Sequence, residues 1–277
     1  MSGERAALMQ AKRIVVKVGT STLTYDNGKV NFTRIDKLAR VLSDLLNQDK
    51  EVVLVSSGAI GVGVGKLKLK EKPKTVQEKQ AVAAVGQCEL MHIYSKFFSE
   101  YGHIVGQILL TRDVVENDHS RRNVINTFET LLKSGIVPVV NENDSVSIDE
   151  IEYGEKLVFG DNDTLSAIVA DLIKADLLII LSDIDGFYDS DPRNNCDSRL
   201  LSIIHEITPE IEKCAGGAGS RRGTGGMITK LAAAGIAIEK GFDMVLTSGS
   251  EPEVIMDIIA GTDIGTLFTS GCDEKRI

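Results

Sequence analysis

The stretch RIVVKVGTSTL, residues 13–23, sets the fold class, because it is a short apolar run that ends on small and polar residues. Its first part, residues 13–18, is rich in β-branched side chains, which predicts a strand. Further along, apolar residues recur at helical spacing: Ile35, Leu38, Leu42, Leu45 and Leu46. A strand followed by an amphipathic helix is the repeating unit of a parallel sheet.

The same alternation of apolar runs and helical patterns continues along the chain. Further strands are predicted at residues 51–55, 103–110, 136–140, 176–181 and 243–247. Helices are predicted at residues 75–100, 121–133, 165–174 and 227–240, with Gly135 as a C-terminal cap after the second of them. Strands that alternate with helices need crossover connections, so the predicted fold is α/β, with a mainly parallel sheet covered on both faces.

Length and composition predict one globular domain. The 277 residues allow one large domain or two small ones. No Ser/Gly linker divides the chain and no repeat of about 20 to 50 residues is visible, so residues 1–277 are predicted to form a single domain. The four cysteines and four histidines show none of the spacings typical of metal ligands, so no protein-bound metal is expected.

Charge and hydropathy argue against two kinds of partner. The net charge is -9, from 40 acidic and 31 basic side chains, which is unsuited to neutralising nucleic acid phosphates. The basic run Lys66, Lys68, Lys70 and Lys72 is short and is interpreted as a solvated face. No secretory signal is visible, and the longest strongly apolar run, residues 177–181, is far shorter than a membrane span. A cytoplasmic protein without a membrane partner is therefore predicted.

Small and polar residues follow the predicted strands at their carboxyl ends. They occupy residues 19–21, 56–58, 141–144 and 182–183. Because ligands of parallel sheets bind beyond the carboxyl ends of the strands, these loops are predicted to form one polar site.

Three glycine-containing segments are candidates for binding phosphate. Gly19 follows the first strand, and SSGAIG at 56–61 joins the second strand to a helix, where backbone amides and the helix dipole favour anions. Ordinary turn chemistry explains either segment equally well. The segment AGGAGSRRGTGGMITK at 215–230 is the more telling, since its glycines lead into a helix that carries Lys230; a disordered surface loop is the alternative. Neither a Walker A loop nor a GxGxxG motif is present.

Two further features indicate a charged ligand. Lys17 stands inside an apolar strand, where an unpaired ammonium would be costly, so it is predicted to reach into the site; a snorkelling surface lysine is the alternative. Asn and Asp are dense at 141–144 and 160–163, where Asp161 or Asn162 could simply cap a helix. Two such segments exceed the needs of capping and suit a ligand that bears an ammonium group.

Seven stretches together resemble the amino acid kinase family. They run in order through most of the chain and are jointly specific, although each is weak alone: VVKVGTSTL at 15–23, VSSGAIGVG at 55–63, AAVGQ at 83–87, VPVVNENDSV at 137–146, FGDNDTLSA at 159–167, LSDIDGFYDSDPR at 181–193 and GTGGMITK at 223–230. The resemblance implies a three-layer αβα sandwich around an open, mostly parallel sheet of about eight strands.

The resemblance also implies a role for each matching residue. Lys17 and Lys230 would flank the transferred phosphoryl group, and Asp163 would hold both lysines in place. The acceptor would contact Ser57, Asn141, Asp144, Asp161 and Asn162. ATP would contact Gly19, Thr20, Ser182, Asp183, Thr224, Gly225, Gly226, Met227 and Lys230.

The family members that the sequence resembles most closely phosphorylate the side-chain carboxylate of L-glutamate, with ATP and Mg²⁺, in the first step of proline synthesis. Their acyl phosphate product implies a downstream glutamyl phosphate reductase as a functional partner, and a dimer or tetramer is expected from the family. Kinases of the same family that act on acetylglutamate, aspartate, carbamate or UMP stay open as alternatives, and so does a noncatalytic amino acid sensor.

Three features depart from the family pattern. Nothing similar to the C-terminal PUA domain of many bacterial members follows the kinase motifs, so no PUA domain is expected. Ser182 stands where threonine is typical, which keeps the hydroxyl group. Residues 150–159, EIEYGEKLVF, are longer than in compact members, which leaves open the shape of the loop over the acceptor.

Overall fold

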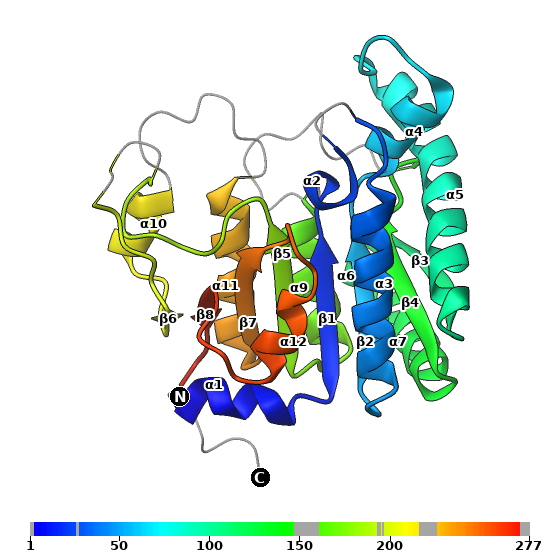
Figure 1. Cartoon of the computed structure of the whole chain (residues 1–277). Coiled ribbons are helices and arrows are strands. Elements are labelled where there is room, and N and C mark those ends of the chain that lie inside the picture. The colour runs from blue at the N-terminus through cyan, green and yellow to red at the C-terminus, as the bar shows by residue number, and fades with distance from the viewer. Residues whose placement is uncertain are drawn as a thin grey trace.

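An eight-stranded sheet lies between two layers of helices (Figure 1) in the computed structural model, which describes residues 3–25, 28–146, 161–192, 195, 197–215 and 226–271. The strands follow the order β3-β4-β2-β1-β5-β7-β8-β6 across the sheet. Their bounds are β1 (Arg13–Val18), β2 (Glu51–Ser56), β3 (Ile104–Leu110), β4 (Ile136–Glu142), β5 (Leu177–Ser182), β6 (Ile203–Ile204), β7 (Asp243–Ser248) and β8 (Thr266–Phe268). The predicted α/β class and its three layers are confirmed.

The sheet is mostly parallel, as predicted. All neighbouring strands from β3 across to β7 are parallel, whereas β8 runs antiparallel to β7 and pairs in parallel with β6. Each predicted strand is present, with bounds that differ by at most two residues. The sequence pattern misses β6 and β8, because runs of two and three residues are too short to show a period.

Helices cover the two faces of the sheet. One face carries α3 (Phe32–Leu46), α5 (Val76–Glu100) and α12 (Val254–Ile259), and the other carries α7 (Asp118–Lys133), α9 (Asn162–Leu172) and α11 (Met227–Lys240). The remaining helices are α1 (Gly3–Ala7), the 3-10 helix η1 (Leu8–Gln10), α2 (Thr20–Leu23), α4 (Ala59–Leu67), α6 (Arg112–Glu116) and α10 (Pro209–Ala215). Across the described ranges, no helix is both long and apolar enough to cross a bilayer.

Local sequence signals explain where several helices begin and end. Thr75 and Glu78 form a reciprocal capping box at the start of α5, which satisfies backbone donors that the helix leaves free. Gly135, predicted as a cap, follows α7 with a φ of 67°, a conformation that glycine adopts without strain. Asp161 caps α9, since its side chain accepts a hydrogen bond from the backbone N–H of Asp163.

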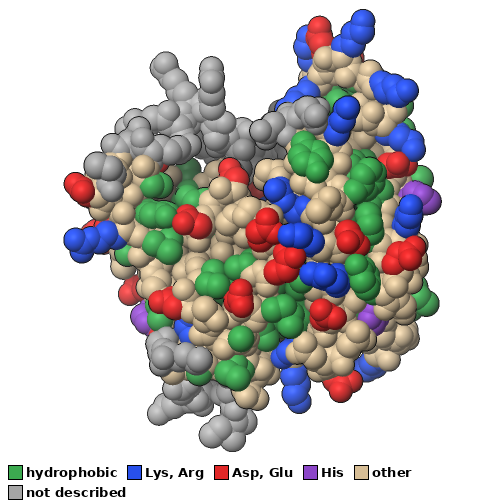
Figure 2. Space-filling view, in the orientation of Figure 1, with side chains coloured by type: hydrophobic (Ala, Val, Ile, Leu, Met, Phe, Trp, Pro, Cys, Tyr) green, Lys and Arg blue, Asp and Glu red, His purple; other side chains and the backbone are tan. Residues whose placement is uncertain are grey.

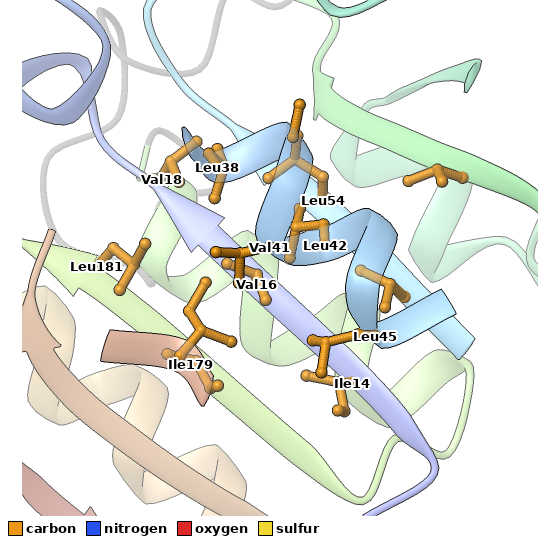
Figure 3. Close-up of a cluster of buried hydrophobic side chains, with 14 of the residues drawn as sticks. Ile14, Val16, Val18, Leu38, Val41, Leu42, Leu45, Leu54, Ile179 and Leu181 are labelled. Carbon is orange, nitrogen blue, oxygen red and sulfur yellow. The ribbon is translucent and has the colours of Figure 1, made fainter. Parts of the chain in front are cut away.

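Alternation along β1 sends its side chains to opposite faces of the sheet. Ile14, Val16 and Val18 point toward α3 and pack into the core of that face (Figure 3). Val15 belongs to the core of the other face, together with residues of α9 and α11. Because Lys17 shares the parity of Val15, its side chain leaves the strand on the side of α9 and α11.

The basic run at the end of α4 and in the segment before α5 is exposed: Lys66, Lys68, Lys70 and Lys72. Figure 1 shows this segment at a protruding end of the molecule, and Figure 2 shows basic side chains gathered there. This exposure agrees with the interpretation of the run as a solvated face.

α4 and α5 approach each other closely through two glycines. A Cβ atom on Gly86 would stand 1.7 Å from the carbonyl oxygen of Ala59, and one on Gly63 would stand 2.2 Å from the carbonyl oxygen of Val82. Neither backbone oxygen moves unless its helix moves, so the approach requires glycine at both positions. It fixes α5 against the segment that follows β2.

Replacing Gly86 by alanine is expected to lower the free energy of unfolding by about 2 to 3 kcal/mol or more, because the added methyl group forces the two helices apart. The matched control is Gly235→Ala in α11, where a Cβ atom meets nothing within 4 Å. There the higher helix propensity of alanine is expected to stabilise the protein by up to about 1 kcal/mol. Urea unfolding measures both variants, and equal stability of the two would contradict the close approach.

Candidate active site

The candidate site lies at the carboxyl edge of the sheet, around the end of β1. This strand pairs with β2 on one side and with β5 on the other, so the chain departs from it in both directions. Such a topological switch point leaves a crevice between the loops that follow the two neighbouring strands. The loops after β2 and β4 lie on one side of β1, and those after β5 and β7 lie on the other.

Lys17, Asp163 and Lys230 meet at this edge from three elements. Lys17 comes from β1, Asp163 from the first turn of α9 and Lys230 from the first turn of α11. Nζ of Lys17 lies 2.5 Å from Oδ1 of Asp163, and Nζ of Lys230 lies 3.0 Å from Oδ2 of the same carboxylate. All three side chains are buried. One carboxylate thus holds two ammonium groups beside each other.

The charges of these three residues favour binding of an anion. Burial alone would raise the pKa of Asp163, but the charges and hydrogen bonds of Lys17 and Lys230 outweigh burial and hold the pKa of this carboxyl below its ordinary value. Asp163 is therefore ionised at neutral pH and compensates one of the two ammonium groups. Within this trio one positive charge remains in excess, which favours an incoming anion.

Asp161 lies in a less favourable electrostatic setting than Asp163. Its burial, together with the negative charge of Asp163, raises the pKa of the Asp161 carboxyl, although Lys17 and hydrogen bonds act in the opposite direction. Asp161 also caps α9, which is the structural alternative to ligand binding that the sequence allows for this residue. A half-buried carboxylate whose ionisation the fold disfavours is also suited to a ligand that brings an ammonium group.

Replacing Asp161 by asparagine is expected to raise the melting temperature at neutral pH by about 2 to 4 °C, which corresponds to about 1 kcal/mol. Asparagine keeps the helix cap but removes the charge that the fold disfavours. Since the pKa of Asp161 is raised on folding, ionisation costs stability above that folded pKa, and the cost vanishes below the unfolded pKa. Thermal unfolding between pH 7 and 4 should therefore show a gain that shrinks with acid; a constant or growing gain would contradict the assignment.

On the β2 and β4 side, amide and hydroxyl groups form a hydrogen-bonded network. Nδ2 of Asn162 donates to Oγ of Ser57 at 2.7 Å and to Oδ1 of Asn141 at 3.0 Å. Nδ2 of Asn141 donates in turn to Oε1 of Gln87 in α5, also at 3.0 Å. Asp144 lies in the turn after β4. The structure thus brings Ser57, Asn141 and Asn162 into contact.

On the β5 and β7 side, the predicted nucleotide contacts lie at strand and helix ends. Oγ of Ser182, the last residue of β5, donates to the exposed carboxylate of Asp183 at 3.0 Å. Met227 opens α11, and its preceding residue Gly226 is exposed. Backbone N–H groups at such a helix start attract anions.

Gly19 and Thr20 directly follow β1, where Gly19 precedes α2 and Thr20 is its first residue. A Cβ atom on Gly19 would stand 3.7 Å from Nζ of Lys17, so the ammonium of Lys17 lies next to this glycine. The predicted contacts Thr224 and Gly225, and the segment 150–159 expected over the acceptor, lie outside the described residues.

Two further residues contact the site: Gln87 lies outside the residues that the resemblance implies for it, whereas Thr229 lies within the segment 224–230 that it implies for ATP. Gln87 accepts a hydrogen bond from Asn141, and Oγ1 of Thr229 donates to Oδ2 of Asp163 at 3.0 Å. Both lie within motifs that carry the family resemblance, AAVGQ and GTGGMITK. Only the three-dimensional contacts separate these residues from their neighbours in the motifs.

The fold and the paired lysines at its switch point define a class of protein. The model of the amino acid kinase family matches residues 12–248, and the chain belongs to this family. Its similarity to particular members extends over almost the whole chain. It is 68% identical over 266 residues to the glutamate 5-kinase of Clostridium perfringens, covering 96% of this chain and 98% of that relative.

Two further relatives give the same picture. Identity to the glutamate 5-kinase of Listeria monocytogenes is 59% over 270 residues, covering 98% of this chain and 97% of that relative. Identity to the glutamate 5-kinase of Enterococcus faecalis is 56% over 271 residues, covering 98% and 99%. The match in each case spans both lysines of the candidate site and the segment between them.

Solved structures with the same fold are much more distant in sequence. The UMP kinase of Bacillus anthracis superimposes with a TM-score of 0.63 at 16% identity, covering 95% of this chain and 97% of that one. An isopentenyl phosphate kinase superimposes with a TM-score of 0.65 at 16% identity, covering 93% and 100%. At this identity the likeness concerns the fold alone.

Proposed function

We propose that this protein transfers the γ-phosphoryl group of ATP to the side-chain carboxylate of L-glutamate, giving L-glutamyl 5-phosphate in the first step of proline synthesis. The observation that carries the proposal is the pair of buried lysines on one carboxylate, Lys17 and Lys230 on Asp163, in a chain 56–68% identical to proteins named glutamate 5-kinase. The paired cations explain the transfer of an anion, and the named relatives specify the acceptor.

The chemistry needs no general base. The side-chain carboxyl of glutamate has an ordinary pKa of about 4.3, so the attacking oxygen is already ionised at neutral pH. The obstacle is repulsion between this anion and the phosphates of ATP. Two unit charges about 4 Å apart interact by about 4 kcal/mol at an effective dielectric constant of 20, so a cation on each side decides whether the approach is feasible. Lys17 and Lys230 supply those cations and stabilise the charge that develops in transfer.

In this proposal the acceptor lies on the side of β2 and β4. Ser57, Asn141 and Asn162 offer hydrogen-bonding groups to its polar atoms. Asp161 and Asp144 offer negative charge to its ammonium group, which would offset the unfavourable burial of Asp161. An acetylated acceptor lacks that charge and fits these two carboxylates less well.

ATP lies on the side of β5 and β7, where Ser182, Asp183 and the start of α11 present hydroxyl, carboxylate and backbone N–H groups. Thr224 and Gly225 belong to the same predicted contact set. Among the described residues, no group of three or more His, Cys, Asp or Glu could hold a metal ion. In this proposal Mg²⁺ arrives bound to the phosphates of ATP, with water as its other ligands, and neutralises phosphate charge.

The product would be an acyl phosphate, a mixed anhydride that water hydrolyses readily. A reductase that consumes it promptly is the functional partner of this proposal. A homodimer or homotetramer and a cytoplasmic location belong to the same proposal, as does an arrangement in which residues 1–277 form a single kinase domain.

A hydroxylamine trap tests the proposed reaction. The protein is mixed with ATP, Mg²⁺, hydroxylamine and one candidate acid, either glutamate, acetylglutamate or aspartate, and the coloured hydroxamate is measured beside the release of ADP. We expect hydroxamate with glutamate alone. Hydroxamate with another acid would reassign the acceptor, ADP release with UMP would indicate a nucleotide acceptor, and glutamate binding without either product would indicate a sensor.

A further inference from the structure

Gln87 is a buried polar side chain of α5 for which the proposed reaction provides no role. It is 8% exposed, and its Oε1 accepts a hydrogen bond from Nδ2 of Asn141. The neighbouring Gly86 brings α5 against the backbone of Ala59, which lies just after β2. The helix therefore delivers Gln87 to the same loops that carry Ser57 and Asn141.

Three amides are joined head to tail in this part of the site. Asn162 donates to Asn141, and Asn141 donates to Gln87. The two atoms at the ends of this amide chain, Oδ1 of Asn162 and Nε2 of Gln87, are both buried and have no hydrogen-bond partner among the described residues. A buried polar atom without a partner is costly, so each end calls for a physical explanation.

The direction of the amide chain determines what Asn162 offers to a ligand. In the observed direction Nδ2 of Asn162 is used inside the protein, by Asn141 and Ser57, and the carbonyl oxygen is left over. If all three amides rotated by half a turn, Asn162 would instead offer its NH₂ group. A free carbonyl oxygen accepts from an ammonium group, whereas a free NH₂ group would repel it.

We propose that Gln87 is a positioning residue that sets this direction, so that Asn162 presents its carbonyl oxygen to the ammonium group of the acceptor amino acid. The inference rests on the proposed function and assigns a basis for its specificity. Oε1 of Gln87 accepts from the amide of Asn141, and Oδ1 of Asn141 accepts from the amide of Asn162, so loss of the Gln87 acceptor leaves the Asn141 amide free to turn. Gln87 therefore acts on the ligand through Asn141 and Asn162.

Two substitutions at Gln87 separate this role from simple packing. Gln87→Met has nearly the same shape and helix propensity but removes the acceptor for Asn141. Gln87→Glu keeps an acceptor oxygen facing Asn141 in either protonation state of the new carboxyl. The readout is the specificity for the ammonium group, measured as the ratio of kcat/KM for glutamate to kcat/KM for glutarate, which lacks that group.

We expect Gln87→Met to raise KM for glutamate about tenfold or more and to reduce the preference over glutarate by a similar factor, as the loss of one buried hydrogen bond implies. KM for ATP should be unchanged, because the nucleotide lies on the other side of β1. Gln87→Glu should keep the preference within about threefold of the parent value. The matched control is Gln77→Met, at an exposed position of the same helix.

The outcomes distinguish this inference from the proposed function. If the parent protein forms no hydroxamate with glutamate, the proposed function fails. If the parent protein does form hydroxamate, two results for Gln87→Met overturn the positioning role. One is an unchanged preference for glutamate over glutarate. The other is an equal loss of kcat/KM for both acids together with a raised KM for ATP. Should Gln87→Met not fold, Gln87→Glu decides alone: a preference preserved within about threefold supports the role, and a larger loss excludes it.

Discussion

Lys17→Met and Lys230→Met are each expected to lower kcat by a factor of about 100 to 1,000 or more, because each variant loses a buried cation that stabilises charge in the transition state. Both ammonium groups lie within 3.0 Å of the carboxylate of Asp163, so neither is a freely moving surface charge whose loss solvent could compensate. Methionine fills a similar volume without a charge. Initial rates of hydroxamate formation at saturating ATP and glutamate measure the effect.

A second lysine on the helix of Lys230 serves as the control for the loss of turnover. Lys240, the last residue of α11, is exposed, and Lys240→Met should keep kcat near the parent value. Circular dichroism and thermal unfolding must show that the Lys17 and Lys230 variants remain folded, since Asp163 still retains one of its two partners in each. Near-normal turnover in either folded variant would refute the proposed role of that lysine.

The main elements of the fold follow from local patterns, because their signals are contained within them. The strand at 13–18 and the helix at 227–240 have the bounds that the sequence predicts. Such segments are long enough to show a hydrophobic period, and each is followed directly by glycine. β8, with only three residues, is a strand because it pairs with β7 and β6, and that pairing is not encoded within Thr266–Phe268 itself.

The candidate site is less visible in the sequence, because its partners come from distant segments. The cost of burying an ammonium in an apolar strand singles out Lys17, but nothing near Lys17 identifies its partner, which lies at the start of α9.

Arg5, outside the candidate site, is another buried cation whose partners cannot be identified from the residues near it in the sequence. It is 1% exposed. Its guanidinium pairs with the carboxylate of Asp263 and donates to backbone carbonyls of Ser202, Ile264 and Gly265, all far away in the sequence.

Asp163→Asn is expected to lower both stability and turnover strongly. Asparagine has nearly the same shape as aspartate but no charge, so Lys17 and Lys230 are left close together in a buried setting and repel each other. Removing one partner from a buried ion pair typically costs about 3 to 5 kcal/mol. Turnover should fall at least as far as in either lysine variant, because both cations lose the carboxylate that orients them. Urea unfolding and hydroxamate formation measure the two effects.

The dependence on pH separates this charge effect from a general loss of packing. The pKa of Asp163 is lower in the folded protein than its ordinary value of about 3.9, so its stabilisation is complete above that value and is lost as pH falls through the folded pKa. The stability difference between the parent and Asp163→Asn should therefore be largest at neutral pH and shrink below about pH 4. A difference that is unchanged or grows in acid would mean that shape, and not the charge of Asp163, holds the two lysines.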